Sequence, residues 1–229
     1  MLTTQFVPAA DPISRRLMVV LHGLGDSLAG WRWLPGELKL PWMNYLLVNA
    51  PQDYFDGYSW FRLGIPQVNG GRLTVESADV VASRRQLHEL LDAQRAAGWP
   101  SELTSILGFS QGCLMTLDAG LRYPHRLAAL VGISGWVHEP GQLLAEHAVA
   151  AAQLPVLVTH GAMDEVVPMT LAEPGVRQLQ AAGFDVAWQE FEKGHTVAGH
   201  AEVGYIRRFL EGVYAQAPQK SRATGPAEG

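Results

Sequence analysis

The sequence predicts an α/β protein with a mostly parallel central sheet and helices on both faces. Apolar runs without polar alternation recur along the chain, as strands buried on both faces of a parallel sheet require. Segments with helical spacing of apolar residues separate these runs, which is the order of a parallel α/β sheet. The chain has 229 residues, of which 48% are hydrophobic and 17% charged, so it can bury the core of one ordinary domain.

Strands and helices are expected in alternation along the chain. An edge strand is expected at residues 3–8, and buried strands at 17–21, 45–50, 106–107, 127–134, 154–160 and 184–191. Helices are expected at 77–97, directly after residue 110, and at 140–152, 169–182 and about 199–214. Ser77 is the expected N-cap of the helix at 77–97, and Gly98 its end. No insertion is large enough for a separate cap domain, so we expect one domain at 1–214 and a disordered tail at 215–229.

Charge and composition exclude several classes of partner. The net charge is −5 and the basic residues are scattered, so nucleic acid is not an expected partner. The single cysteine, Cys113, excludes an internal disulfide and a cysteine-rich metal cluster, and its place at a buried helix start favours a small apolar role. No apolar run approaches the ~18 residues of a membrane span, and the N-terminus lacks the pattern of a signal peptide. We expect a soluble, cytoplasmic monomer or homodimer that does not insert into membranes.

A candidate nucleophile stands where one apolar run meets a helical segment. The sequence Gly108-Phe109-Ser110-Gln111-Gly112 follows the strand at 106–107 and precedes apolar residues at helical spacing. A serine on so sharp a turn holds a strained backbone, and its neighbours two positions away must be small where strand and helix cross. The unpaired N–H groups of the following helix face the reacting centre. Between a strand and a helix, Gly-x-Ser-x-Gly therefore predicts a nucleophile elbow at Ser110.

Two further polar residues follow later strands. Asp164 comes after the strand at 154–160, and His195 after the strand at 184–191. Since ligands bind outside the carboxyl ends of parallel strands, we expect both side chains to meet Ser110 at one edge of the sheet. The order nucleophile, acid, base is that of α/β-hydrolases. His195 would accept the proton of Ser110, and Asp164 would hold the imidazole in the correct tautomer.

The strand at 17–21 ends in the glycine-rich segment His22-Gly23-Leu24-Gly25-Asp26. Glycines at this position leave backbone N–H groups free to face a ligand, and in α/β-hydrolases the position supplies half of the oxyanion hole. We expect the N–H groups of Leu24 and Gln111 to form that hole. Taken alone, the segment also fits a plain strand-to-helix turn with Asp26 or Ser27 as the cap.

Other residues compete for the acid and base roles. Glu165 adjoins Asp164 and is the alternative acid. His195 is the histidine that follows the last expected strand, which comes after Asp164 in the chain. His160 ends the strand before Asp164, and we expect it to take part in the hydrogen bonding of the loop that carries Asp164, the acid loop. The remaining histidines lie in the glycine-rich segment, on helices or in surface-like contexts: His22, His88, His125, His138, His147 and His200.

The segment 51–76 is the longest irregular stretch before the tail and is rich in aromatic residues. Long loops in compact domains usually carry function. We interpret this one as the wall of a shallow acyl-binding groove, and the candidate substrate contacts are Tyr58, Trp60, Phe61 and Val167. The alternative is that the aromatic residues only fill the edge of the core. Arg62 could favour a negatively charged substrate group, and an ordinary surface arginine fits the sequence as well.

With these residues assembled, the chain resembles the phospholipase/carboxylesterase branch of the α/β-hydrolases, which includes acyl-protein thioesterases and small bacterial carboxylesterases. The His-Gly-Leu-Gly-Asp and Gly-Phe-Ser-Gln-Gly strings are quite specific to this branch. The matching segments lie between residue 17 and about residue 210: Leu21 to Asp26, Asn49-Ala50-Pro51, Ser59-Trp60-Phe61, Gly108 to Gly112, Gly161-x-x-Asp164-x-x-Val167-Pro168 and Gly194-His195. The resemblance implies the α/β-hydrolase fold and a serine hydrolase that uses no cofactor or metal.

The resemblance also implies the reaction, which is cleavage of carboxylic esters or thioesters through an acyl-enzyme. We expect short-to-medium acyl chains. Two departures bear on substrate choice: Arg62 stands where relatives often carry an acidic residue, and Cys113 where they often carry glycine. The alternatives are an acyl-protein thioesterase or lysophospholipase, a peptidase or lactonase on the same scaffold, and a catalytically silent binding module. The intact set Ser110, Asp164 and His195 argues against the silent module.

Overall fold

The computed structural model describes residues 1–64 and 74–216 of the 229-residue chain. The last helix, α6 (Gly199–Gln216), extends two residues beyond its expected end at 214. The rest of the tail expected to be disordered, 217–229, lies outside the described residues, as do residues 65–73 of the segment interpreted as a groove wall.

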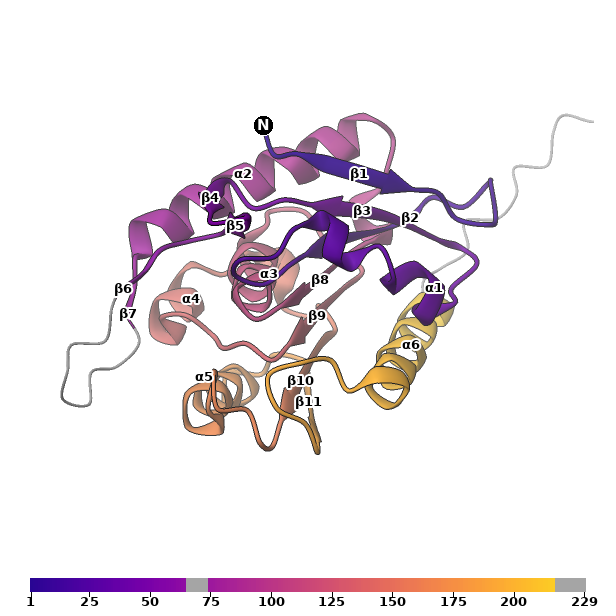
Figure 1. The fold of residues 1–229 in the computed structure, drawn as a ribbon. Coiled ribbons are helices and arrows are strands. Elements are labelled where there is room, and N and C mark those ends of the chain that lie inside the picture. The colour runs from indigo at the N-terminus through magenta and orange to yellow at the C-terminus, as the bar shows by residue number, and fades with distance from the viewer. Residues whose placement is uncertain (65–73, 217–229) are drawn as a thin grey trace, which may run out of the picture.

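The core of the molecule is a seven-stranded sheet in the order β1-β3-β2-β8-β9-β10-β11 (Figure 1). The edge strand β1 runs antiparallel to β3, and all other neighbours in this sheet are parallel. The sequence therefore predicts the mostly parallel sheet and its edge strand correctly. The strands of this sheet are β1 (Thr4–Val7), β2 (Arg16–Leu21), β3 (Met43–Val48), β8 (Thr104–Phe109), β9 (Ala129–Ile133), β10 (Val156–Gly161) and β11 (Val186–Phe191).

Helices cover both faces of the sheet (Figure 1). One face carries α2 (Ser77–Ala96), α3 (Gln111–Arg122), α4 (Pro140–Glu146) and α5 (Met169–Ala181), and the other carries α1 (Leu34–Leu38) and α6. Short 3₁₀ turns join some of these elements: Leu28–Trp31, Ser101–Leu103 and Val149–Ala151. In the described part of the chain, no helix is long and apolar enough to cross a membrane.

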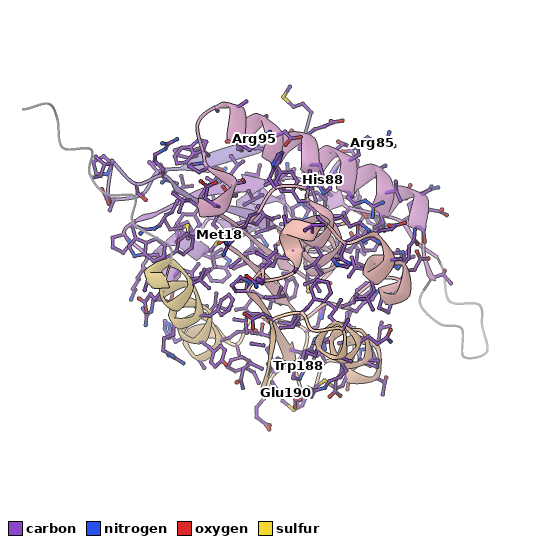
Figure 2. The ribbon with its side chains drawn as sticks, turned by 180° about the vertical axis from the view of Figure 1, so that it is seen from behind. Met18, Arg85, His88, Arg95, Trp188 and Glu190 are labelled. Carbon is purple, nitrogen blue, oxygen red and sulfur yellow. The ribbon has the colours of Figure 1, made fainter. Side chains whose placement is uncertain are left out.

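Alternate side chains of each strand pack on opposite faces, which explains the continuous apolar runs. On β2, Leu17, Val19 and Leu21 pack in the cluster with α2 to α5. Met18 and Val20 point the other way and pack in the cluster with α1 and α6. Figure 2 shows Met18 beside α6, with the sheet between it and the helices of the opposite face.

The segment 51–64 differs from the expected irregular loop. It contains the hairpin of β4 (Gln52–Tyr54) and β5 (Gly57–Ser59), and β6 (Leu63–Gly64) pairs with β7 (Thr74–Val75). The first hairpin is tied to the glycine-rich segment after β2 by a bridge between Asp26 and Tyr58. Strands of two or three residues are too short to show an alternating pattern in the sequence.

The start of α2 also differs from the expectation. The N-cap is Glu76 rather than Ser77, whose hydroxyl lies 3.1 Å from Nε2 of His138. Asp79 in the first turn accepts hydrogen bonds from the backbone N–H (3.0 Å) and guanidinium Nε (2.7 Å) of Arg62. This pairing lowers the pKa of Asp79 to about 2. Arg62 thus anchors the end of the segment 51–64 to α2.

Candidate active site

Ser110 stands between the end of β8 and the first residue of α3, with φ 55° and ψ −115°. A positive φ is strained for any residue with a Cβ, and it turns the serine side chain out of the crossing between strand and helix. The crossing itself leaves no room. A Cβ on Gly108 would lie 2.1 Å from the carbonyl oxygen of Gly112, and a Cβ on Gly112 would lie 2.2 Å from that of Leu21. Both glycines are therefore required by close backbone approach.

The three polar residues expected to converge form one hydrogen-bonded chain. His195 Nε2 lies 2.9 Å from Ser110 Oγ, and His195 Nδ1 lies 2.8 Å from Asp164 Oδ2. An Asp164 carboxylate can only accept, so Nδ1 carries the imidazole proton and Nε2 is free to accept the serine proton. The residues come from the ends of β8, β10 and β11, and their side chains are mostly buried, His195 being the most exposed at 16%.

The Asp164 carboxylate is held from two sides. Its Oδ1 accepts the backbone N–H groups of Val166 (3.0 Å) and Val167 (2.8 Å), which leaves Oδ2 for the imidazole. The buried side chain of His160 donates through Nε2 to the Val167 carbonyl (2.8 Å), and burial lowers its pKa. His160 thus serves the hydrogen bonding of the acid loop, as expected from the sequence. Glu165, the alternative acid, is exposed, and no described hydrogen bond joins it to His195.

His22 fixes the peptide plane that carries the Leu24 N–H. Its Nε2 accepts the N–H of Ala50 (3.0 Å), so Nδ1 holds the proton and donates to the Gly23 carbonyl (2.6 Å). In a planar trans peptide the carbonyl and the following N–H point in opposite directions. Holding the Gly23 carbonyl therefore turns the Leu24 N–H away from His22. Within residues 1–64 and 74–216, this N–H has no hydrogen-bond partner.

The second expected oxyanion donor is the N–H of Gln111, the first residue of α3. The first N–H groups of a helix have no carbonyl of the same helix to donate to. The buried side chain of Gln111 has a different task. Its Oε1 accepts the N–H of Trp60 (3.0 Å), and its Nε2 donates to the carbonyl of Phe61 (2.8 Å). The residue after the candidate nucleophile therefore holds the segment 59–61 against the elbow. The sequence gives no sign of this contact, which spans 50 positions.

The burial of the four candidate substrate contacts corrects one interpretation. Trp60 and Phe61 are 0% exposed and belong to the core, so they do not form the wall of an open groove. The Trp60 indole donates to the His22 carbonyl (2.9 Å), which supports the glycine-rich segment from behind. Val167 is also buried at 2%, and Tyr58 is the partly exposed member of the four. For Trp60 and Phe61, the alternative of filling the core edge is the one that the burial supports.

Other apolar side chains near the candidate site are exposed instead. Phe55 is 91% and Tyr54 40% exposed at the tip of the β4–β5 hairpin, and their rings meet edge to face at 4.9 Å. The Tyr54 ring lies against Gly25, the residue that follows Leu24 in the chain. On the acid loop, Met163 is 57% and Val166 64% exposed. The sequence singles out the aromatic segment but cannot tell which of its rings face solvent.

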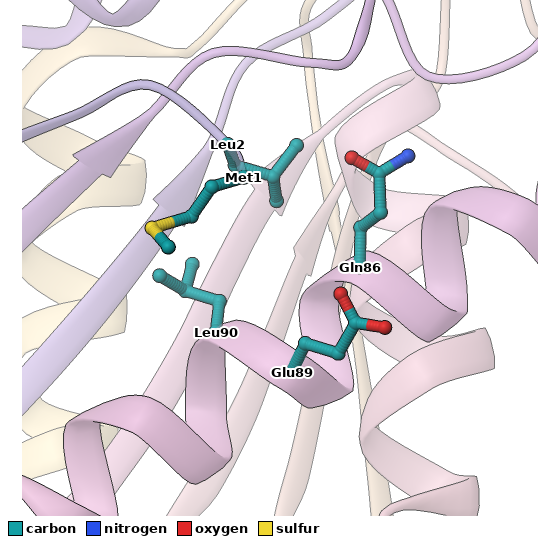
Figure 3. Close-up of a pocket in the computed structure, with 5 residues that line it drawn as sticks. All are labelled: Met1, Leu2, Gln86, Glu89 and Leu90. Atoms are coloured by element: carbon teal, nitrogen blue, oxygen red, sulfur yellow. The ribbon is translucent and has the colours of Figure 1, made fainter.

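Two cavities in the described part of the chain lie away from these residues. One, of about 220 Å³, is lined by the N-terminus and α2 through Met1, Leu2, Gln86, Glu89 and Leu90 (Figure 3). The other, of about 160 Å³, lies among α2, α3 and the start of α4. Ser110, Asp164 and His195 line neither. In the described part of the chain, no group of three His, Cys, Asp or Glu residues could hold a metal ion.

Comparison with known proteins gives the family. The family model described as phospholipase/carboxylesterase matches residues 2–213. Acyl-protein thioesterase 1 of Schizosaccharomyces pombe is 33% identical over 179 residues, which are 71% of this chain and 74% of the relative. The crystal structure of esterase PE8 is 30% identical, with a TM-score of 0.77 over 93% of this chain and 99% of that one. The structure of Zea mays acyl-protein thioesterase 2 is 26% identical, with a TM-score of 0.76 over 92% and 98%. The chain is therefore an enzyme of the phospholipase/carboxylesterase family of α/β-hydrolases.

Proposed function

We propose that this protein is a serine hydrolase that cleaves carboxylic esters of short-to-medium acyl chains, with thioesters as a second substrate class. The hydrogen-bonded chain from Ser110 Oγ through His195 to Asp164 is the observation that carries the proposal. Relatives named carboxylesterase and acyl-protein thioesterase support both substrate classes. The cytoplasmic location and the monomeric or dimeric state expected from the sequence stay predictions.

In the first half of the reaction, Ser110 Oγ attacks the carbonyl carbon while its proton passes to His195 Nε2. The carbonyl π-electrons move to the oxygen, and the N–H groups of Leu24 and Gln111 stabilise the oxyanion, each worth roughly 3–4 kcal/mol. The intermediate collapses as His195 returns the proton to the leaving alcohol or thiol. In the second half, His195 takes a proton from water as the hydroxide attacks the acyl carbon. It returns this proton to Ser110 Oγ as the bond to the acyl group breaks and the acid leaves.

Exposed apolar side chains support the acyl preference. Tyr54 and Phe55 on the hairpin, with Met163 and Val166 on the acid loop, offer apolar surface beside the Leu24 segment and the His195 loop. Each CH₂ buried on such a surface gains about 0.8 kcal/mol. Because these side chains are exposed, an acyl chain that packs on them would lie on an open surface. We expect soluble monomeric esters to be better substrates than emulsified long-chain lipids.

The test is hydrolysis of p-nitrophenyl esters with two, four, eight and twelve acyl carbons, with and without a serine-directed phosphonate. Wild-type protein should hydrolyse the shorter esters, and the phosphonate should stop it stoichiometrically. Ser110→Ala and His195→Ala should each abolish activity, and the double variant should be no worse because the residues act as one unit. A Ser110→Ala variant that keeps a tenth of the activity would refute the assignment. A wild type inert to all esters and to the phosphonate would favour the silent binding module.

A further inference from the structure

The loop that carries His195 is built around a buried ion pair. Lys193 and Glu202 have side chains that are 3% and 0% exposed. Lys193 Nζ lies 2.6 and 2.8 Å from the two carboxylate oxygens of Glu202 and donates its third hydrogen bond to the carbonyl of Thr196 (2.7 Å). Burial lowers the pKa of Lys193, and the Glu202 charge opposes that shift. Charged pairs are rarely buried to this degree, because desolvation is costly even where the partners match.

Both sides of His195 depend on this pair. Two residues before His195, the Lys193 side chain is bound by Glu202. Three residues after His195, the N–H of Ala198 donates to Glu202 Oε2 (2.6 Å). The Thr196 carbonyl, held by Lys193 Nζ, belongs to the residue directly after the imidazole. A single carboxylate at the start of α6 thus fixes the backbone of the loop before and after His195. Backbone contacts also hold the loop, among them those of the Thr196 N–H with the Gly194 carbonyl (2.9 Å) and of the Lys193 N–H with the Phe191 carbonyl (2.8 Å).

Lys193 also joins the two loops that carry the base and the acid. The base loop, residues 192–198, lies between β11 and α6 and carries His195, and the acid loop, residues 162–168, lies between β10 and α5 and carries Asp164. The Lys193 carbonyl accepts the N–H of Met163 (3.0 Å), one position before Asp164. The two loops approach so closely that a Cβ on Gly161 would lie 2.4 Å from this carbonyl. A shift of Lys193 would therefore move the loop of His195 relative to that of Asp164. Proton transfer along the chain requires distances of about 2.6–3.2 Å, so small displacements are costly.

We propose that Lys193 and Glu202 are positioning residues, whose buried ion pair holds His195 in hydrogen-bond reach of both Ser110 and Asp164. Neither side chain touches the reacting atoms; they act through the loop backbone. The proposal rests on the proposed function, because it assigns His195 the role of the base. It predicts that loosening the pair slows the chemical step and leaves substrate binding almost unchanged.

The first test is Glu202→Gln, which keeps the volume of the side chain but replaces one carboxylate oxygen by an NH₂ group. This NH₂ group would face another donor, either Lys193 Nζ or the Ala198 N–H, so one hydrogen bond is lost. We expect kcat for p-nitrophenyl acetate to fall about 10- to 100-fold, the effect of misplacing a catalytic group by about 1 Å. KM should stay within about twofold, since the binding surface is unchanged. The rate of labelling by the phosphonate should fall by the same factor as kcat.

A matched control is Asp118→Asn, which also weakens a buried carboxylate that is 3% exposed and paired with Arg84 (3.2 Å) and Arg122. Asp118 lies on α3, two turns beyond the candidate nucleophile, and its described hydrogen bonds join it to Arg84 and Arg122 rather than to the loop of His195. Asp118→Asn should lower Tm but leave kcat within about twofold. The positioning proposal is wrong if Glu202→Gln changes kcat by less than about twofold. It is also wrong if Asp118→Asn lowers kcat by the same factor as Glu202→Gln.

A second variant separates positioning from stability. Replacing a buried ion pair by apolar residues of similar volume is often neutral or stabilising, so Lys193→Met with Glu202→Met should recover Tm. It cannot restore the hydrogen bonds to Thr196 and Ala198, and kcat should stay low. Recovery of kcat together with Tm would reduce the pair to a stabilising role. If the wild type has no Ser110-dependent activity, the proposed function fails and this proposal with it; normal activity in Glu202→Gln would overturn this proposal alone.

Discussion

The backbone of Ser110 has a conformation that glycine adopts more readily than serine. Its φ of 55° and ψ of −115° lie outside the regions that residues with a Cβ prefer. A backbone of this kind costs of order 1–3 kcal/mol and persists where the surroundings impose it. Here the surroundings are the close contacts of Gly108 and Gly112 with neighbouring backbone. The strain follows from placing a hydroxyl at the tip of this turn.

This strain predicts a difference between two inactive variants. Ser110→Gly should be more stable than Ser110→Ala by about 1 kcal/mol, because glycine accepts a positive φ and alanine does not. Urea unfolding of the two variants under the same conditions measures the difference, and their shared lack of activity removes any effect of turnover. Equal midpoints, or a more stable alanine variant, would show that the elbow is not strained.

Cys113 shows how burial decides the chemistry of a reactive residue type. It adjoins the elbow, but it is fully buried, and burial raises the pKa of its thiol to about 12. The thiol therefore stays protonated, as the expected small apolar role requires. Cβ atoms on Gly132 and Gly135 would lie 2.6 and 2.7 Å from its sulfur, so it fills the space that these glycines leave.

Among the elements, the β4–β5 hairpin is the one whose part in function the structure redefines. Its first strand leads to the exposed rings of Tyr54 and Phe55, and the segment after its second strand holds the buried rings of Trp60 and Phe61. The two pairs should therefore respond differently to mutation. Buried aromatic residues contribute stability, whereas a 91% exposed phenyl ring such as that of Phe55 contributes little.

We predict that Phe55→Ala lowers kcat/KM more for eight-carbon than for two-carbon acyl esters, by roughly 3- to 10-fold, because an exposed ring can gain contact only with the longer chain. Its Tm should barely change. Phe6→Ala, which removes a 45% exposed ring from the edge strand β1, is the matched control and should affect neither ester. Equal losses on both esters with Phe55→Ala would place the acyl chain elsewhere.

Trp60→Ala should behave in the opposite way. It removes a fully buried ring and its hydrogen bond to the His22 carbonyl, and so should cost about 3–5 kcal/mol of unfolding free energy. Any loss of activity should be similar for all chain lengths. Denaturant unfolding and the same ester series give both readings, and a chain-length effect without loss of stability would restore Trp60 as a substrate contact.

Across the whole molecule, buried neutral histidines couple stability to pH. Burial lowers the pKa of His22, His88 and His160, which lie in the glycine-rich segment, on α2 and on β10. Below their ordinary value of 6.5 the unfolded chain binds protons that the folded chain does not accept, so stability rises with pH in this range. In Figure 2, His88 on α2 is labelled in the upper part of the view and Trp188 on β11 in the lower part. The Trp188 ring stacks on that of His160.

We therefore predict that the free energy of unfolding falls as the pH is lowered from 7.5 to 5.5. Urea unfolding at several pH values measures it, and the range stays above the titration of Asp79, whose pKa is about 2. His88→Gln lies away from the candidate site and should flatten part of the slope. A free energy that is constant or rises as the pH falls would contradict the prediction.

The sequence by itself determined the strands of the seven-stranded sheet, the longer helices and the residues that meet at the sheet edge. Apolar period and glycine position are local properties, and parallel strands bring their carboxyl ends together whatever lies between them. Ser110, Asp164 and His195 could therefore be chosen before their distances of 2.9 and 2.8 Å were known. Short elements such as α1, the β4–β5 hairpin and the pair of β6 and β7 have no such local signature.

Only the tertiary structure decided which face each loop side chain takes. Trp60 turns inward because its indole reaches the His22 carbonyl, 38 positions earlier, and Gln111 holds the same segment from 51 positions later. Lys193 and Glu202 look like ordinary surface charges in the sequence, yet both are buried beside His195. Such contacts depend on packing between residues far apart in the chain, and no local pattern of the sequence records them.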